Sequence, residues 1–224
     1  ARKIGVGGKP LLDEVFAGVS DPAFVDALYG DLGLPRGSAF VLCNVEPAFE
    51  HHYASWDEHW QRFRAVMEGL RDCGLPVVLS LHPLCDAADY RFVEDEYGYV
   101  LCESRRIMEL YPFASVSVSF PCSTNTLAEL FGTPLVIYDF LGLTRENDSR
   151  SDLYRLPGSI CVYGGDELGP AVARALASGR VAPSASVSGS SSCDLILAEV
   201  RRRFGLNEIE PARHATSRDT AGVA

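Results

Sequence analysis

Short runs of β-branched and apolar residues recur along the chain from Ser38 onward, and helical patterns separate most of them. The runs read AFVLCNV, PVVLSLH, GYVLCE, ASVSVSF, PLVIYDF and SICVYGG. Runs that are apolar on both faces and joined by crossover helices are typical of a parallel sheet with helices on each side. We therefore predict an α/β fold, with a Rossmann-like, mainly parallel sheet over residues 38–180.

The clearest helical pattern covers residues 55–73. Ser55 and Glu58 are spaced as a capping box, and Gly74 stands where a helix C-cap is expected. Apolar side chains recur there at steps of four and three, which places them on one helix face: Trp56, Trp60, Phe63, Met67 and Leu70. We interpret this stripe as core and favour that over a sugar-stacking role for the tryptophan pair.

The rest of the chain divides by composition. Residues 1–37 are expected to form a lead-in, with a connector around GVGG and Pro10 followed by a helix from Pro22 to Tyr29. GVGG lacks a preceding strand and a directly following helix, so we do not interpret it as a phosphate loop. Residues 181–193 are predicted to be a Ser-rich linker, 194–206 a C-terminal helix and 207–224 a flexible tail.

Charge and composition exclude several classes of protein. The net charge of −10 opposes the phosphate neutralisation that nucleic-acid binding needs. No apolar run approaches the roughly 20 residues that span a bilayer, and a signal-peptide layout is absent from the start. The seven cysteines never form a C-x-x-C pair, which favours buried thiols in a reducing cytoplasm. We expect a cytoplasmic protein, with the inner face of a membrane as an alternative, and no cofactor.

Polar side chains follow the predicted strands at their carboxyl ends, where parallel sheets form their ligand crevice. The candidates are Glu50 and His51 after the first strand, His82 after the second, Glu103 and Ser104 after the third, and Cys122, Ser123, Thr124 and Asn125 after the fourth. Helix starts also need polar caps, so capping remains an alternative explanation of this clustering.

The group Cys122 to Asn125 suits a phosphate. A helix that begins near Ser123 offers unpaired N–H groups and a partial positive charge, and His82 can donate one more hydrogen bond. Thr126 and Glu129 also match a T-x-x-E capping box, but a helix starting there has barely one turn before Gly132. A metal site on His51, His52 and His82 is disfavoured, because no carboxylate stands at diagnostic spacing. A hydrolase is disfavoured too, since no G-x-S-x-G elbow is present.

Three segments in order, LSLHP (79–83), YVLCES (99–104) and SVSVSFPCSTNTLAELFGTPLVIYDF (115–140), resemble the C-terminal, nucleotide-sugar-binding half of GT-B glycosyltransferases and of the related UDP-N-acetylglucosamine 2-epimerases. The likeness is closest to enzymes of bacterial surface-polysaccharide synthesis. It implies phosphate contacts from His82, Ser123, Thr124 and the amide of Asn125. It further implies base contacts near Glu103 and Ser104, and sugar contacts from Glu50 or His51.

The resemblance implies a donor-binding domain for a UDP- or CMP-type nucleotide sugar. In such enzymes the acceptor site and commonly the catalytic base belong to a first Rossmann-like domain, so we assign no catalytic residue here. We expect that partner domain in the same longer chain or in trans, and an isolated half that is catalytically inert. Two alternatives remain open: a sugar-nucleotide 2-epimerase-like domain, and a non-catalytic interaction domain with the same fold.

Overall fold

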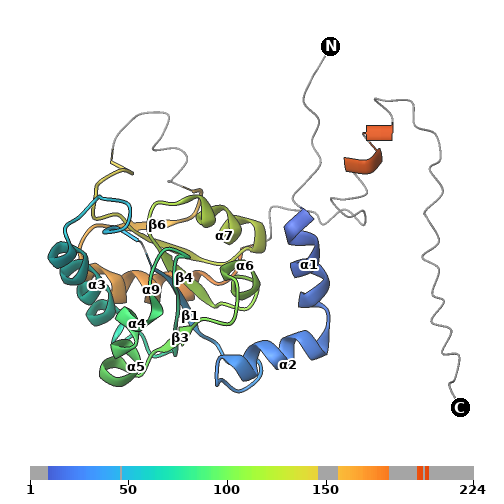
Figure 1. Ribbon diagram of the computed structural model, residues 1–224, viewed down its shortest axis with the longest axis horizontal. Coiled ribbons are helices and arrows are strands. Elements are labelled where there is room, and N and C mark those ends of the chain that lie inside the picture. Colours follow the sequence, from blue (N-terminus) through green and yellow to red (C-terminus); the bar gives the residue numbers. More distant parts are fainter. Residues whose placement is uncertain (1–9, 46, 146–155, 182–195, 199, 202–224) are drawn as a thin grey trace, which may run out of the picture. The chain divides into compact units, whose positions relative to one another are not determined.

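The computed structural model describes residues 10–45, 47–145, 156–181, 196–198, 200 and 201 (Figure 1). The chain divides into two compact units, residues 1–13 together with 188–224, and residues 14–187. The larger unit contains the segment in which the Rossmann-like sheet was expected. The predicted tail, the GVGG connector and the predicted linker after its first residue, Val181, lie outside the described residues. Of the predicted C-terminal helix, residues 196–198, 200 and 201 are described and helical.

A parallel sheet forms the centre of the larger unit. Its six described strands are ordered β3-β2-β1-β4-β5-β6, and every neighbouring pair is parallel. The strands are β1 (Val41–Asn44), β2 (Val77–Ser80), β3 (Val100–Cys102), β4 (Val116–Ser119), β5 (Leu135–Tyr138) and β6 (Ile160–Val162). Each lies within one of the six apolar runs, so the predicted α/β fold with a mainly parallel sheet is confirmed.

The strand order places a topological switch point in the middle of the sheet. The chain runs from β1 outward to β2 and β3, returns to β4 on the other side of β1, and then continues outward to β5 and β6. At such a reversal the connections leaving the two central strands diverge, which opens a crevice at their carboxyl ends. β1 and β4 border this crevice.

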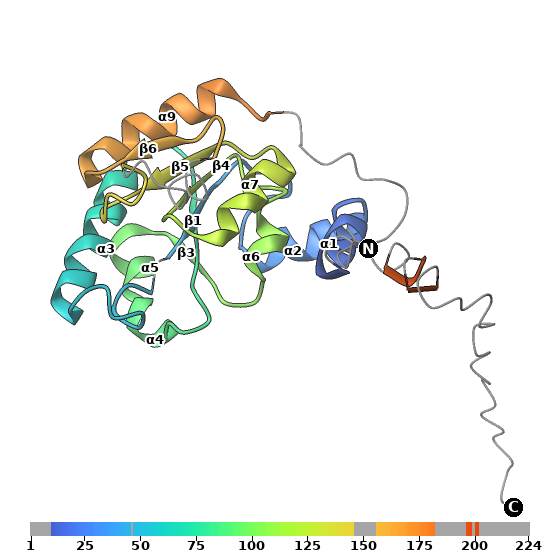
Figure 2. The same ribbon diagram turned by 90° about the horizontal axis from the view of Figure 1, so that it is seen from above.

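Helices α3 (Trp56–Leu70) and α9 (Leu168–Ser178) pack together against one face of the sheet. Figure 2 shows strands β4 and β5 between α9 and α7 (Thr126–Phe131). Alternate strand residues face α3 and α9, as Val41 and Cys43 of β1 do, whereas Leu42 is buried outside that cluster. The sheet is thus buried on both faces, which explains why its strands are continuously apolar in sequence.

Helix α3 matches its prediction at the start and differs in detail further on. Ser55 and Glu58 form the predicted capping box, with the Ser55 amide donating to Glu58 Oε2 at 2.9 Å. The helix ends at Leu70, three residues before the predicted end. Trp56 is 39% exposed and His59 is buried in its place, because the 3.6-residue period brings positions 59, 63, 66, 67 and 70 to the sheet.

The described residues also form the helices α1 (Pro10–Val19), α2 (Pro22–Asp31), α4 (Ala87–Tyr90), α5 (Phe92–Tyr97) and α6 (Ile107–Leu110), and the 3₁₀ turns η1 (Ser123–Asn125) and η2 (Gly165–Glu167). The predicted helix at Pro22 is confirmed, with Asp21 as its cap. The connector expected at Pro10 was wrong: α1 begins there, since proline is well suited to the first helical position. Across the described residues, no helix has the length and apolar character needed to cross a bilayer.

Candidate functional site

Side chains from the ends of β1 and β4 form a hydrogen-bonded cluster across the switch point. Asn44 Nδ2 donates to Thr124 Oγ1 at 3.1 Å and to Cys122 Sγ at 3.6 Å. Cys122 Sγ lies 2.8 Å from Thr124 Oγ1 and 3.5 Å from Ser119 Oγ. Asn44 therefore ties the end of one central strand to the polar turn that follows the other. Ser123, next to this cluster, is exposed.

Asn125 holds this turn in place from the inside. Its side chain is buried, with Nδ2 donating to Phe120 O at 2.7 Å and Oδ1 accepting from Ser119 Oγ. Its backbone N–H, which the resemblance assigned to a phosphate, donates to Cys122 O at 3.2 Å. A 3₁₀ turn pairs its third amide in this way, one residue earlier than an α-helix would. Ser123 and Thr124 supply the first two amides of the turn.

The helical segment starts where the longer of the two predicted helices did. η1 begins at Ser123 and leads directly into α7 at Thr126. The alternative T-x-x-E capping box does not form: α7 has no side-chain cap, and Thr126 Oγ1 instead donates to Ser123 O at 2.8 Å. In the segment from Cys122 to Asn125, the side chains of Cys122, Thr124 and Asn125 therefore form hydrogen bonds within the protein, whereas Ser123 is exposed to solvent.

A cavity of about 510 Å³ opens at the carboxyl ends of β2 and β3. It is lined by Ser80, Leu81, His82, Pro83, Cys85, Ala87, Cys102, Glu103, Ser104, Arg105, Arg106, Ile107 and Met108. The structure thus brings His82, expected at a phosphate, together with Glu103 and Ser104, expected at the base. Ser123 and Thr124 do not line this cavity; they lie beyond Asn44, on the far side of β1.

The charged side chains around this cavity are paired with one another or with neighbours. Glu103 accepts from Arg91 at 2.7 Å, Arg105 pairs with Asp31 at 2.6 Å, and Arg106 pairs with Glu109 at 2.7 Å. Arg105 and Arg106 were not predicted as site residues, although they directly follow Glu103 and Ser104 in sequence. Their ion pairs leave the cavity without a strong net charge, which suits a neutral heterocycle.

His82 is held as a hydrogen-bond donor toward the rim. Its Nδ1 accepts from the Leu84 amide at 3.2 Å, which leaves the proton on Nε2. Burial lowers the pKa of His82 below its ordinary value; nearby His51 lowers it further, and Glu50 opposes both. The His51 ring lies 5.4 Å from the His82 ring, edge to face. Neutral His82 therefore carries its proton on Nε2, which makes that atom a hydrogen-bond donor.

Glu50 and His51 belong to the loop between β1 and α3. This loop is folded on itself, with the His51 amide donating to Pro47 O and the Tyr53 amide to Ala48 O, both at 2.9 Å. Glu50 Oε2 is shielded from solvent and accepts no hydrogen bond from the described residues. A buried carboxylate oxygen in this state is an acceptor that a ligand hydroxyl satisfies well.

A polar network under this loop was not predicted from the sequence. The Tyr90 hydroxyl lies 2.8 Å from His59 Nε2 and 3.6 Å from Cys85 Sγ. Burial lowers the pKa of His59 and raises that of the Cys85 thiol to about 11. The only sequence signal was the position of His59, four residues before Phe63 on the buried stripe. Among the described residues, no group of three or more His, Cys, Asp or Glu side chains could hold a metal ion.

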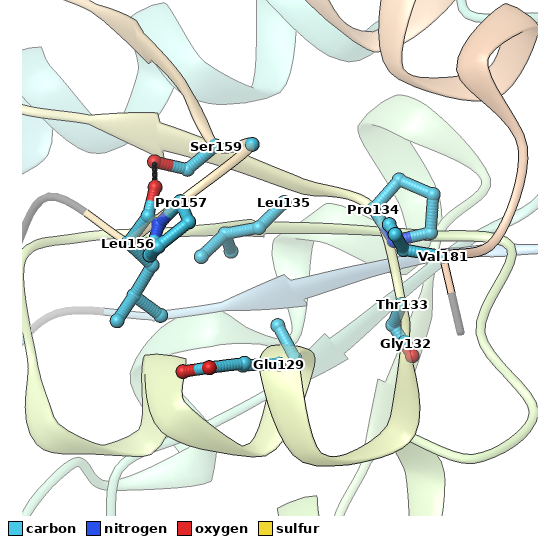
Figure 3. A pocket seen from close by; sticks show the side chains of 11 residues that line it. Glu129, Gly132, Thr133, Pro134, Leu135, Leu156, Pro157, Ser159 and Val181 are labelled. Carbon is cyan, nitrogen blue, oxygen red and sulfur yellow. Dashed lines mark hydrogen bonds between the residues drawn. The ribbon is translucent and has the colours of Figure 1, made fainter. Parts of the chain in front are cut away.

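A smaller pocket of about 210 Å³ lies at the opposite ends of β5 and β6 (Figure 3). Leu135, the first residue of β5, and Ser159, which precedes β6, lie in its wall with Pro134, Pro157 and Val181. Glu129 lines it from α7. None of the predicted site residues lines this pocket, so the candidate site is at the other end of the sheet.

A scan of protein-family models and a search of curated proteins each returned no match. Several solved structures have a similar fold, including the following three. The UDP-GlcNAc 2-epimerase of Methanocaldococcus jannaschii in complex with UDP-GlcNAc and UDP aligns with a TM-score of 0.59 and 15% identity, over 89% of this chain and 55% of the epimerase. A second structure of that epimerase aligns with a TM-score of 0.51 and 13% identity, over 90% and 56% of the two chains. The wall teichoic acid polymerase TagF with CDPG aligns with a TM-score of 0.52 and 12% identity, over 88% and 50%.

The chain has the fold of one half of these enzymes. It spans about 55% of the epimerase and 50% of the polymerase. The resemblance carried by LSLHP, YVLCES and the segment 115–140 is thereby confirmed at the level of the fold, with a UDP-GlcNAc 2-epimerase and a wall teichoic acid polymerase both among the similar structures. At these identities the similarity shows the fold alone, because one fold can carry many different functions.

Proposed function

We propose that this chain is the nucleotide-sugar (donor) binding domain of a glycosyltransferase in bacterial surface-polysaccharide synthesis. One observation carries the proposal: the exposed turn at Ser123, tied to β1 by Asn44, lies at the switch point and at the same carboxyl end of the sheet as the cavity lined by His82, Glu103 and Ser104. Ligands of open parallel sheets bind in this crevice.

The phosphates are held at the Ser123 turn. The amides of Ser123 and Thr124 begin a helical turn and have no acceptor within it, and the exposed Ser123 hydroxyl adds a donor. His82 donates through Nε2 from the second strand. Asn125 contributes by fixing the turn. Hydrogen-bond donors of this kind act on the anion locally. They can therefore bind it although the whole chain has a net charge of −10.

The base and the sugar occupy opposite sides of His82. The base lies in the cavity at β2 and β3 near Ser104 and Glu103, and the charge of Glu103 is compensated by its ion pair with Arg91. The sugar lies toward the β1 loop, where Glu50 Oε2 is available as an acceptor and His51 flanks His82. Stabilising the charge that grows on the leaving nucleotide is this domain's contribution to glycosyl transfer.

A first Rossmann-like domain, in the same longer chain or in trans, completes the enzyme across the rim. This chain covers about half of the similar enzymes. Large apolar side chains are also exposed in the segments that follow β1, β2 and β5: Phe49, Tyr53, Trp56, Leu84 and Leu141. Exposed apolar side chains of this kind are typical of a surface that contacts a second domain. The isolated chain then binds its nucleotide without turnover, and the cytoplasm or the inner face of a membrane is its predicted location.

Calorimetric titration of the folded chain tests the proposal, with UDP, CMP, UDP-GlcNAc and a CMP-sugar as ligands. We expect saturable binding of a UDP- or CMP-type ligand. His82→Ala and Ser123→Ala should each weaken it about tenfold, the loss of about 1.4 kcal/mol that removal of one charge-assisted hydrogen bond gives. Ser178→Ala, at the far end of α9, is the matched control and should not change the affinity. The absence of binding for all four ligands would overturn the proposal.

A further inference from the structure

Arg62 is a cation at the carboxyl rim that the site described above does not use. Its guanidinium carbon lies 4.4 Å from the centre of the Phe140 ring. Together with Ala48, His59, Phe63, Phe120 and Phe140, it borders a small cavity of about 10 Å³. Ala48 belongs to the loop after β1, Phe120 follows β4 and Phe140 follows β5, so Arg62 reaches the switch-point end of the sheet from helix α3.

The guanidinium of Arg62 lacks the partners that other arginines of the chain have. Arg62 Nη1 is shielded from solvent and donates no hydrogen bond to the described residues, and no carboxylate among them forms an ion pair with it. Glu58, one turn earlier on α3, uses its carboxylate for the capping box with Ser55. Contact with the Phe140 face stabilises the charge but leaves the N–H groups of Nη1 without a hydrogen-bond partner among the described residues.

An anion is the group that satisfies such a side chain best. A guanidinium presents planar N–H donors that match a carboxylate or a phosphate, and partial burial strengthens the attraction. The Phe120 ring beside Arg62 follows β4, and Ser123 and Thr124 come three and four residues later along the same connection. Arg62 therefore borders the connection that leaves β4 and continues into the Ser123 turn.

We propose that Arg62 binds a second anionic group of the donor, in addition to the phosphate at the Ser123 turn. This inference rests on the proposed function. The group is either the β-phosphate of a nucleoside diphosphate or the carboxylate of an acidic sugar linked to a nucleoside monophosphate. Arg62 thereby selects donors with two anionic groups over donors with one. A donor with one anionic group is held at the Ser123 turn only and leaves the Arg62 guanidinium unpaired.

Calorimetry with four probes tests this: UDP against UMP, and CMP-N-acetylneuraminate against CMP. The variant is Arg62→Gln, and Arg62→Met, which keeps an apolar stem on Phe140, is a second variant. Arg64→Gln is the matched control, since Arg64 lies on the same helix and also stacks on a phenyl ring at 4.4 Å, but is exposed and paired with Glu96 at 2.6 Å. Circular dichroism and thermal melting establish that each variant is folded.

If Arg62 binds a β-phosphate, Arg62→Gln lowers the affinity for UDP about tenfold or more and leaves the affinity for UMP unchanged. If it binds a carboxylate, the same loss appears for CMP-N-acetylneuraminate and not for CMP. The proposal is overturned if Arg62→Gln lowers the affinity for all four ligands less than twofold. It is also overturned if Arg64→Gln lowers the affinity as much as Arg62→Gln does. Without any variant, equal affinity of the unaltered chain for both members of each pair also overturns it. Absence of binding to all four probes overturns the proposed function itself.

Discussion

His59 is buried on the sheet-facing side of α3, where its Nε2 lies 2.8 Å from the Tyr90 hydroxyl. Burial lowers the pKa of His59, while nearby Glu50 acts in the opposite direction. The unfolded chain therefore takes up a proton at this residue at a higher pH than the folded chain does. The stability contributed by neutral His59 is complete above the unfolded pKa of roughly 6.5 and is lost as the pH falls from there toward the folded value.

We expect His59→Gln to reduce this pH dependence. Glutamine can still hydrogen-bond to Tyr90 but does not titrate, so the variant should lose about 1 kcal/mol at pH 7.5 through imperfect geometry. Its melting temperature should then fall less than that of the unaltered chain between pH 7 and pH 5.5. Thermal melts followed by circular dichroism measure both quantities. Parallel decreases in the two proteins would show that His59 does not control this transition.

Asn44 joins the end of β1 to the turn after β4 through its side chain. Asn44→Ala should remove the tie between β1 and Thr124, weaken UDP or CMP binding about fivefold and reduce stability by about 1 kcal/mol. Asn44→Asp should weaken binding further, because it places a carboxylate beside the expected phosphate. Calorimetry and urea unfolding measure these effects. Unchanged affinity in Asn44→Asp would place the phosphate elsewhere.

At the scale of elements, two glycines allow α3 to contact η2. A Cβ atom on Gly69 would overlap Gly165 O and approach Leu168 of α9 at 3.1 Å, and one on Gly165 would lie 2.7 Å from Ala65 O. The backbones of α3 and η2 therefore touch directly. This contact seats the loop after β6 against the helix that also carries His59 and Arg62, so the rim depends on it.

Gly69→Ala should destabilise the chain by about 1–3 kcal/mol, because backbone atoms cannot move aside as a flexible side chain can. Gly30→Ala in α2 is the matched control: its Cβ meets nothing within 4 Å and its backbone is helical. The control should stabilise the chain by about 0.5–1 kcal/mol, as glycine-to-alanine changes in helices do. Urea unfolding compares the two. A neutral Gly69→Ala would contradict the direct contact of α3 and η2.

For the molecule as a whole, the reactivity of the cysteine thiols depends on their burial in the core or their exposure at the candidate site. The six described cysteines are free thiols. Burial raises the pKa of Cys43, in β1, to about 12, and also raises that of Cys102, in β3. Cys122 instead lies partly exposed at the rim, next to Ser123. A thiolate is the reactive form, so an accessible thiol reacts before buried thiols whose pKa is raised.

Alkylation of the native chain with iodoacetamide at pH 7.5, followed by mass spectrometry, should label Cys122 well before Cys43 and Cys102. In guanidinium chloride all three should react at similar rates. Saturating UDP or CMP should slow labelling of Cys122 at least severalfold, since a phosphate at the Ser123 turn covers it. Labelling of Cys122 that is indifferent to every nucleotide would argue against ligand binding at this turn.

Local features of the sequence determined most of the elements of this protein. Continuous apolar runs predicted the strands β1 to β6, and the spacing of apolar residues predicted α3 and its capping box at Ser55. Position after a strand was also enough to place His82 and Ser123 at the carboxyl rim. These properties depend on the backbone period and on neighbours a few residues away, which the sequence displays directly.

Only the tertiary structure decided how distant residues meet. The strand order, with β4 beside β1, lets Asn44 reach Thr124 from 80 positions away. The same packing buries His59 while leaving Trp56 exposed, and it pairs Glu103 with Arg91. It also carries Arg62 to the rim without an ion-pair partner among the described residues. Such contacts depend on which elements lie side by side, and many strand orders are compatible with one pattern of apolar periodicity.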